Sequence, residues 1–264
     1  MELLRTENIS KSYSGRMILR DISMHLEKGE LVSLLGLSGS GKTTLLNILS
    51  GLIRPDAGSV YLSGVEITGQ PGHISYMLQK DLLLEHKRVI DNVALPLIIR
   101  GMKKEEARKR AEPCFRDFDL EGTQTLYPSQ LSGGMRQRAA LLRTYLGSQG
   151  VILLDEPFSA LDMITREQLH AWYLDIMSRM GFSTVLITHD VDEAIQLSDR
   201  IYLLTGSPGE IHHEIRVDCP RNTRQDFNLL PEFAAYKRQI RDILQEAMRT
   251  SNAAGYPLLL VFAQ

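Results

Sequence analysis

Short buried strands alternate with helical segments along most of the chain. Residues 31–35 and 151–154 are mostly apolar and have the length that is typical of strands buried in a parallel sheet. Residues 183–188 and 200–204 predict two more strands, and helices are predicted from residue 45, over residues 166–180 and around Ala194. This alternation predicts a doubly wound, mostly parallel α/β sheet with its chemistry at the carboxyl ends of the strands.

The N-terminal part follows a different pattern. Alternating residues around Leu3 and Leu4 and over residues 18–26 are bounded by turns at residues 14–15 and 28–29, which predicts antiparallel strands. Residues 59–67 alternate as a further strand, and residues 73–78 predict a short strand that ends at Gln79.

A helical block interrupts the α/β pattern from about residue 84 to residue 148. Residues 91–101 and 103–118 read as helices, and Pro113 should kink or restart the second one. That helix has an apolar face at helical spacing, formed by Ala107, Ala111, Cys114, Phe115 and Phe118.

One more amphipathic helix is predicted over residues 227–249. Its apolar stripe, which we interpret as core packing, consists of Phe233, Tyr236, Ile240, Ile243, Leu244 and Ala247. Residues 251–264 read as an exposed tail without a motif.

Composition indicates a soluble globular enzyme. The chain has 264 residues, of which 43% are hydrophobic and 23% charged, and its net charge of −2 gives no argument for nucleic-acid binding. Cys114 and Cys219 lie far apart, which fits a reducing compartment better than a disulfide framework or a metal site. There is no N-terminal signal and no apolar run of the roughly 20 residues needed to span a bilayer, so we expect a cytosolic protein that meets a membrane only through a partner.

Residues 36–44 (Gly-Leu-Ser-Gly-Ser-Gly-Lys-Thr-Thr) match the phosphate-binding pattern G-x-x-x-x-G-K-[ST]. The predicted strand before them and helix after them are the context that this loop requires. The glycines let backbone N–H groups and a helix N-terminus point at phosphate. Lys42 adds a charge for the β- and γ-phosphates, and the Thr43 hydroxyl can join the shell of Mg²⁺.

Two carboxylates, Asp155 and Glu156, stand at the end of a buried strand, where they are costly unless a cation compensates them. A magnesium nucleotide supplies that compensation. Tyr13 lies in a polar turn where its ring could stack on a nucleotide base, although an exposed tyrosine is by itself a weak signal.

The order of these motifs resembles the ATP-binding subunits of ATP-binding cassette (ABC) transporters over roughly residues 3–205. After the phosphate loop come Gln79, residues 131–135 (Leu-Ser-Gly-Gly-Met), Asp155-Glu156, residues 159–162 (Ser-Ala-Leu-Asp) and His189. The Leu-Ser-Gly-Gly segment is the most diagnostic, because other phosphate-loop ATPases lack it. Met135 stands where the commonest form has Gln, at a position that varies in the family.

The resemblance implies a P-loop NTPase core with an antiparallel β subdomain and an inserted α-helical subdomain, and it implies ATP and Mg²⁺ as ligands. Asp155, Thr43 and Gln79 would hold the metal, and Glu156 would be the general base that polarises water. His189 would contact the γ-phosphate, and Lys42 and Gln79 would complete the catalytic set. The nucleotide-binding residues would be Tyr13, Gly36, Leu37, Ser38, Gly39, Ser40, Gly41, Lys42, Thr43, Thr44, Ser132, Gly133, Gly134 and Asp162.

The family's domain organisation predicts one ATPase domain over residues 1–250. Residues 1–83 and 149–215 would form the α/β core with its β subdomain, and residues 84–148 the helical signature subdomain. Residues 216–250 would be a C-terminal helical extension, followed by the tail at 251–264.

The resemblance also implies partners. Two subunits would sandwich two ATP molecules head to tail, so that Ser132, Gly133 and Gly134 of one complete the site of the other. A groove beside Gln79 would receive a helix of a membrane permease, and residues 82–84 (Leu-Leu-Leu) would serve both that surface and internal packing. The subunit would lie at the cytoplasmic face of the membrane, in a system that includes an extracytoplasmic solute-binding protein.

Three further segments indicate which group of ABC transporter ATPases the sequence resembles most. Residues 131–138, 188–194 and 207–211 (Ser-Pro-Gly-Glu-Ile) resemble ATPases of nitrate, sulfonate, taurine and bicarbonate importers, a group that includes relatives serving thiamine-precursor uptake. That group often has Leu-Leu-Pro-Trp where residues 83–86 are Leu-Leu-Glu-His, which leaves the solute undetermined.

Two other functions stay open at this point. A soluble ABC ATPase acting on nucleic acid or ribosomes usually carries two cassettes or long coiled coils, whereas this chain has one motif set and no heptad run. A nucleotide-binding regulator without turnover is disfavoured by the intact Glu156 and His189.

Overall fold

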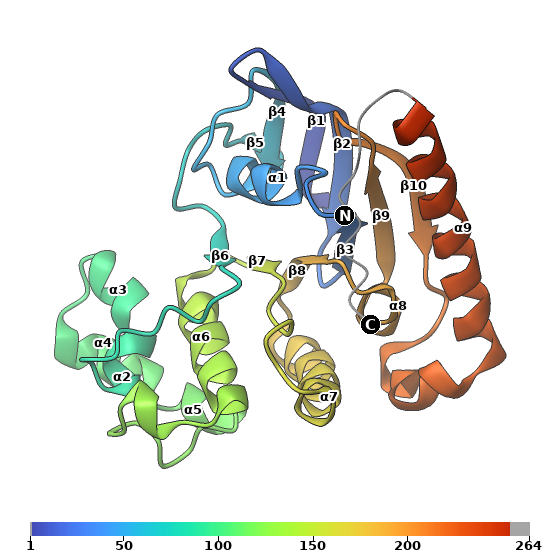
Figure 1. Cartoon of the computed structure of the whole chain (residues 1–264). Coiled ribbons are helices and arrows are strands. Elements are labelled where there is room, and N and C mark those ends of the chain that lie inside the picture. Colours follow the sequence, from blue (N-terminus) through green and yellow to red (C-terminus); the bar gives the residue numbers. More distant parts are fainter. Residues whose placement is uncertain (1, 254–264) are drawn as a thin grey trace. The chain divides into compact units, whose positions relative to one another are not determined.

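The computed structural model describes residues 2–253, apart from the side chains at 222, 225 and 250–253. Its contacts divide the chain into two compact units. The first unit consists of Met1–His73 and Ser183–Gln264, and the second of Ile74–Phe182. Each is described by itself below, with element labels as in Figure 1.

An antiparallel sheet in the first unit has the strand order β2-β1-β4-β5. It contains β1 (Glu2–Tyr13), β2 (Arg16–Glu27), β4 (Ala57–Leu62) and β5 (Val65–Glu66). The predicted antiparallel strands are confirmed, but the single strand expected over residues 59–67 is wrong. Ser63 and Gly64 have φ angles of 51° and 81°, so the chain reverses there into a hairpin.

Parallel strands in the same unit carry the phosphate loop. β3 (Leu31–Gly36) lies between β8 (Ser183–Thr188) and β9 (Arg200–Thr205), parallel to both. All residues of these three strands are buried, as predicted for a parallel sheet. Two helices, α1 (Lys42–Leu49) and α8 (Val191–Leu197), follow β3 and β8 in the chain. The edge strand β10 (Glu210–Arg216), antiparallel to β9, was not predicted.

The C-terminal extension consists of the 3-10 helix η2 (Arg221–Leu229) and the helix α9 (Pro231–Ala253). The predicted start at residue 227 is wrong, because Pro231, which suits a helix's first turn, begins the α-helix. Phe233 and Ile240 pack with β9 and β10 residues in one buried cluster, with Tyr236, Ile243 and Leu244 against it, so the core-packing interpretation is confirmed. Residues 251–253 of the expected tail belong to α9, and residues 254–264 lie outside the described residues.

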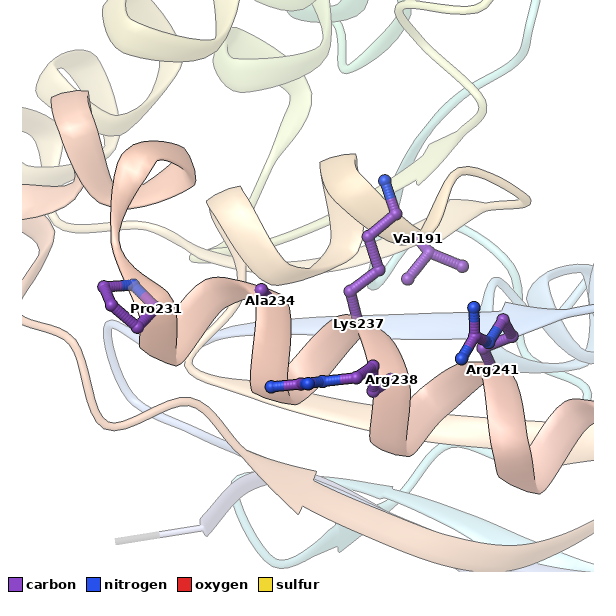
Figure 2. A pocket seen from close by; sticks show the side chains of 6 residues that line it. All are labelled: Val191, Pro231, Ala234, Lys237, Arg238 and Arg241. Carbon is purple, nitrogen blue, oxygen red and sulfur yellow. The ribbon is translucent and has the colours of Figure 1, made fainter.

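A pocket of about 520 Å³ lies between α8 and α9 (Figure 2). Lys237 Nζ lies 2.8 Å from Asp192 Oδ2 and so links α9 to the α8 region. The lining residues are Val191, Pro231, Ala234, Lys237, Arg238 and Arg241. The extension therefore adds a cationic surface made of residues outside the predicted nucleotide site.

The second unit is largely helical around two parallel strands, β6 (Ser75–Met77) and β7 (Val151–Asp155). The expected helix over residues 91–101 is two short helices, since Pro96 lacks the N–H that would continue the first. Pro113 restarts the next helix as predicted, and Phe115 and Phe118 of its apolar face are fully buried. The helical elements are α2 (Val89–Val93), α3 (Leu95–Ile99), α4 (Lys104–Ala111), α5 (Cys114–Asp117), η1 (Pro128–Gln130), α6 (Gly133–Gly147) and α7 (Met163–Met180).

Candidate functional site

The phosphate loop connects the end of β3 to the start of α1. Gly41 is the N-cap of α1 with φ 97° and ψ 9°, a left-handed conformation that favours glycine. Ser38 and Gly39 are exposed at the tip, and Thr43 is exposed in the first turn of α1. The N-terminus of α1 and the loop backbone therefore form the kind of concave donor surface that binds phosphate.

Lys42 is folded back onto this loop. Its Nζ donates to Gly36 O at 2.8 Å and to Leu37 O at 2.9 Å, and only 7% of the residue is exposed. The ammonium is thus already held at the loop, where a phosphate can replace the carbonyl contacts. The Ser40 Oγ is buried and has no hydrogen-bond partner among the described residues, an unsatisfied donor that a phosphate oxygen would satisfy.

Two other predicted nucleotide-site residues belong to the first unit. Tyr13 ends β1 and is 44% exposed, and Lys11 Nζ lies 5.5 Å from the centroid of its ring. His189 is exposed directly after β8. Asp190 caps α8 by accepting from the backbone N–H groups of Asp192 and Glu193, which fixes the turn that carries His189.

In the second unit, Asp155 is the last residue of β7 and is 9% exposed. The Tyr76 hydroxyl donates to Asp155 Oδ2 at 3.1 Å from the adjacent strand β6. Burial, and then the charge of Asp155, raise the pKa of Tyr76 well above its usual value, so the phenol stays protonated and donates. Sequence reasoning missed Tyr76, which lies in β6 before Gln79.

Glu156 and Gln79 are brought together by β7 and the segment after β6. Gln79 Nε2 donates to Glu156 Oε2 and to Ser159 Oγ, both at 3.3 Å. Glu156 has φ 45°, a left-handed conformation that is uncommon for a residue with a side chain. The predicted general base and the residue expected to sense the metal thus share a hydrogen bond in this structure.

The Leu-Ser-Gly-Gly segment forms the start of α6. Ser132 is the N-cap, and its Oγ accepts from the Met135 backbone N–H at 3.3 Å. Ser132 and Gly133 are exposed, so the start of this helix is accessible. Asp162 is the exposed N-cap of α7 and accepts from Thr165 N at 3.0 Å, and hydrogen bonding from Thr165 lowers the pKa of Asp162.

A set of hydrogen bonds not found from the sequence fastens the segment after Gln79 to α6. Arg136 binds Asp81 through two nitrogens, at 2.9 and 3.1 Å, and Arg143 donates to Leu82 O at 2.8 Å. Burial alone would raise the pKa of Asp81, but hydrogen bonds from Arg136 and Leu83 hold it below its usual value. Arg136 Nη2 also donates to Glu85 Oε1 at 2.7 Å, so one of the two residues that depart from the group pattern has a partner on α6.

The predicted residues are therefore distributed over both units. Tyr13, the phosphate loop and His189 belong to the first unit, and Gln79, Asp155, Glu156, Ser132 and Asp162 belong to the second. Within the units the structure brings Gln79 to Glu156 and Lys42 to the loop backbone.

A phosphate loop between a buried strand and a helix, followed by a strand that ends in paired carboxylates, defines a P-loop nucleoside-triphosphatase. The comparisons with known proteins make the class more specific. The family model described as ABC transporter matches residues 19–159. The chain belongs to this ABC transporter family, and it is an ATP-binding cassette that hydrolyses ATP.

Curated relatives match over nearly the whole chain. The formylaminopyrimidine import ATP-binding protein ThiZ of Halalkalibacterium halodurans is 38% identical over 252 residues, which is 94% of this chain and 99% of that protein. The taurine import ATP-binding protein TauB of Pseudomonas aeruginosa is 38% identical over 262 residues, covering 96% and 100%.

A solved structure shares the fold. The dimeric, post-hydrolysis ATP-binding cassette MJ0796, bound to ADP and phosphate, has a TM-score of 0.69 and 31% identity, over 83% of this chain and 100% of that chain. The predicted P-loop ATPase fold is confirmed.

Proposed function

We propose that this protein is the ATP-hydrolysing subunit of an ABC importer, which couples ATP binding and hydrolysis to the uptake of a small solute through a membrane permease. The observation that carries the proposal is the Leu-Ser-Gly-Gly start of α6, with Ser132 exposed, in a chain that also has the phosphate loop. The names of the relatives support import, with formylaminopyrimidine, taurine, nitrate and aliphatic sulfonates as the printed solutes. The solute of this system is proposed to come from that range.

Mg²⁺ fits the residues that would hold it. The Thr43 hydroxyl, the Gln79 amide oxygen and the Asp155 carboxylate are hard oxygen donors, which Mg²⁺ prefers. Within residues 2–253 no group of three or more His, Cys, Asp or Glu side chains could hold a metal, so phosphate oxygens of the nucleotide would supply the remaining ligands. The bound ion would neutralise charge that develops on the phosphates.

The protein's own groups take the other roles. Lys42 would move from its loop carbonyls to the phosphates, and His189 would contact the γ-phosphate. Glu156 would accept the proton of the attacking water. Gln79 donates to Glu156 through Nε2 and so orients the carboxylate that would accept this proton, while its amide oxygen would stay available to a metal.

Exposed residues of the second unit support a proposed homodimer. Ser132 and Asp162 are exposed N-caps, and Met163 and Ile164 after Asp162 are 73% and 69% exposed. Neighbouring exposed apolar side chains beside functional polar groups are typical of a protein interface. We therefore propose that each subunit's Ser132 region and Asp162 segment cover the ATP bound by the other subunit.

The segment after Gln79 supports a permease surface. Leu82 is 52% exposed while Leu83 is 6% exposed, and Leu84 is half-buried. Arg143 donates to the Leu82 backbone carbonyl, and Arg136 binds the Asp81 side chain. These contacts fix the backbone of the segment, so that the Leu82 side chain is exposed from a fixed position. Within residues 2–253 no helix could cross a bilayer. The membrane contact of the proposed system would be made by the permease. An extracytoplasmic solute-binding protein would complete the system, with this subunit at the cytoplasmic face.

Glu156→Gln tests the general base. The amide keeps hydrogen bonding but cannot take the proton, so ATP binding should persist, hydrolysis should fall by about 100-fold or more, and an ATP-dependent dimer should accumulate. ATP turnover and size-exclusion chromatography with ATP measure these outcomes. Glu167→Gln, an exposed change on α7, is the matched control, and normal steady-state turnover by Glu156→Gln would overturn the assignment.

Ser132→Arg tests whether the signature acts on a partner's ATP. The bulky cation should abolish hydrolysis and the ATP-dependent dimer, while the isolated monomer binds ATP as before. Fluorescent-nucleotide titration of the monomer is the deciding measurement, with Ser129→Arg as a control at an exposed serine before the motif. Loss of ATP binding by the monomer would contradict a role in trans.

Leu82→Asp tests the permease surface. Because Leu82 is exposed, the folded state and ATP binding should be retained, while solute uptake and co-purification with the permease are lost. Leu83→Asp should instead destabilise the fold by about 3 kcal/mol or more, because a charge would be buried. Leu52→Asp, at a side chain that is 63% exposed in the first unit, is the control. Unchanged uptake with Leu82→Asp would refute the surface.

Tyr76→Phe tests the support of the proposed metal ligand. Removing the hydroxyl that donates to Asp155 should weaken Mg²⁺ binding by about 10-fold, as is usual when a hydrogen bond that orients a ligand is lost. The readout is the Mg²⁺ concentration that half-saturates the Mg²⁺-dependent part of ATP binding, compared with Tyr127→Phe, an exposed tyrosine of the same unit. An unchanged Mg²⁺ requirement would remove Tyr76 from the metal site.

A further inference from the structure

The segment of residues 207–211, which comprises the end of the turn after β9 and the first residues of β10, touches the phosphate loop. Gly209 is buried, and a Cβ atom at this position would lie 2.1 Å from Ser40 O and 3.4 Å from Leu204 Cδ1. A Cβ atom and the Ser40 carbonyl oxygen cannot occupy the same space, so only glycine fits at position 209 without displacing the loop. The phosphate loop therefore rests on Gly209.

The same glycine is hydrogen-bonded to β2. Its N–H donates to Ile18 O at 2.8 Å, and its carbonyl accepts from Arg20 N at 3.0 Å. Glu210 adds an ion pair with Arg20, at 2.9 Å. These contacts fasten the segment to β2 from both sides of Gly209.

β2 in turn supports the next residue of the loop. Leu19, which pairs with Gly209 as an isolated bridge, is fully buried, and its Cδ2 would lie 2.7 Å from a Cβ atom at Gly41. Gly209 and Leu19 thus contact Ser40 and Gly41, two consecutive residues that lead into α1.

The segment also reaches the turn that carries Tyr13. β2 starts at Arg16, which pairs with Tyr13 across the turn at residues 14–15. Arg16 Nη2 donates to Ser207 Oγ in a long hydrogen bond of 3.5 Å. This is a second link between the segment and the turn, since β2 itself runs from Arg16 to the residues that contact Gly209. The segment of residues 207–211 therefore contacts both the phosphate loop and the start of β2, next to the turn that follows Tyr13.

We propose that residues 207–210 set the spacing between the Tyr13 turn and the phosphate loop, so that the base and the phosphates of one nucleotide are held at the same time. Gly209 is a positioning residue in this arrangement, because it acts through Ser40 and β2. The inference rests on the proposed roles of Tyr13 and residues 36–44 in nucleotide binding.

Gly209→Ala tests the proposal with two probes, ATP and inorganic tripolyphosphate. The added Cβ should displace Ser40, so the affinity for both probes should fall by about 10-fold or more. Gly58→Ala is the matched control, because a Cβ there would lie 2.3 Å from Glu7 O in the antiparallel sheet. Both variants should lose thermal stability, but only Gly209→Ala should lose affinity. Affinities within about twofold of the wild type would overturn the proposal.

The spacing itself is tested with Tyr13→Ala. In the wild type this change should weaken ATP but not tripolyphosphate, and in the Gly209→Ala background its effect on ATP should shrink, because base and phosphates are no longer held together. Equal effects in the two backgrounds would overturn the spacing role.

A milder variant covers the case in which Gly209→Ala does not fold. Glu210→Gln removes the carboxylate that contacts Arg20 and His212 without adding an atom near Ser40, and it should weaken both probes by a few-fold with little change in melting temperature. Unchanged affinities would then overturn the proposal. If the wild type binds neither ATP nor tripolyphosphate, the proposed function itself fails, which is a different result.

Discussion

Close packing of backbone beneath the phosphate loop is the constraint on which the first unit depends. A Cβ at Gly36 would lie 2.3 Å from Leu204 O, and one at Gly209 would lie 2.1 Å from Ser40 O. Parallel pairing of β3 with β9 brings the first of these pairs together, and the turn after β9 brings the second. A loop that must present its backbone to phosphate is therefore held from behind by backbone, which moves less than side chains do.

In the second unit, hydrogen bonds and an ion pair, rather than close backbone packing, hold the functional segments in place. Asp155 is buried with a Tyr76 hydrogen bond, and Asp81 is held by Arg136. Arg136 thereby compensates the charge of Asp81, and the Tyr76 hydroxyl satisfies one oxygen of the buried Asp155. Because Arg136 stands four residues after Ser132 on the same helix, the segment that follows Gln79 and the signature serine share one support. A displacement of either one would therefore also displace the other.

The sequence predicted what local pattern and motif determine. The buried strand at Ser183–Thr188, the phosphate loop and the restart at Pro113 were all found, because short-range signals specify them. The hairpin at Ser63–Gly64 was missed although the sequence carries a signal for it, because Ser-Gly favours a turn and the apolar positions shift from 60 and 62 to 65 and 67. Tyr76, Gly209 and the Asp81–Arg136 pair could not be found, since each depends on a contact between residues far apart in the chain. The exposure of Leu82 rather than Leu83 likewise follows from tertiary packing.

The left-handed conformation of Glu156 affects both the stability and the activity of variants at this position. At φ 45° a side chain costs about 1 kcal/mol that glycine would not. Replacing the proposed base by glycine should therefore make the folded protein more stable while it removes turnover. Stability and activity oppose each other at this position, so a screen for thermostable variants alone would favour catalytically dead ones.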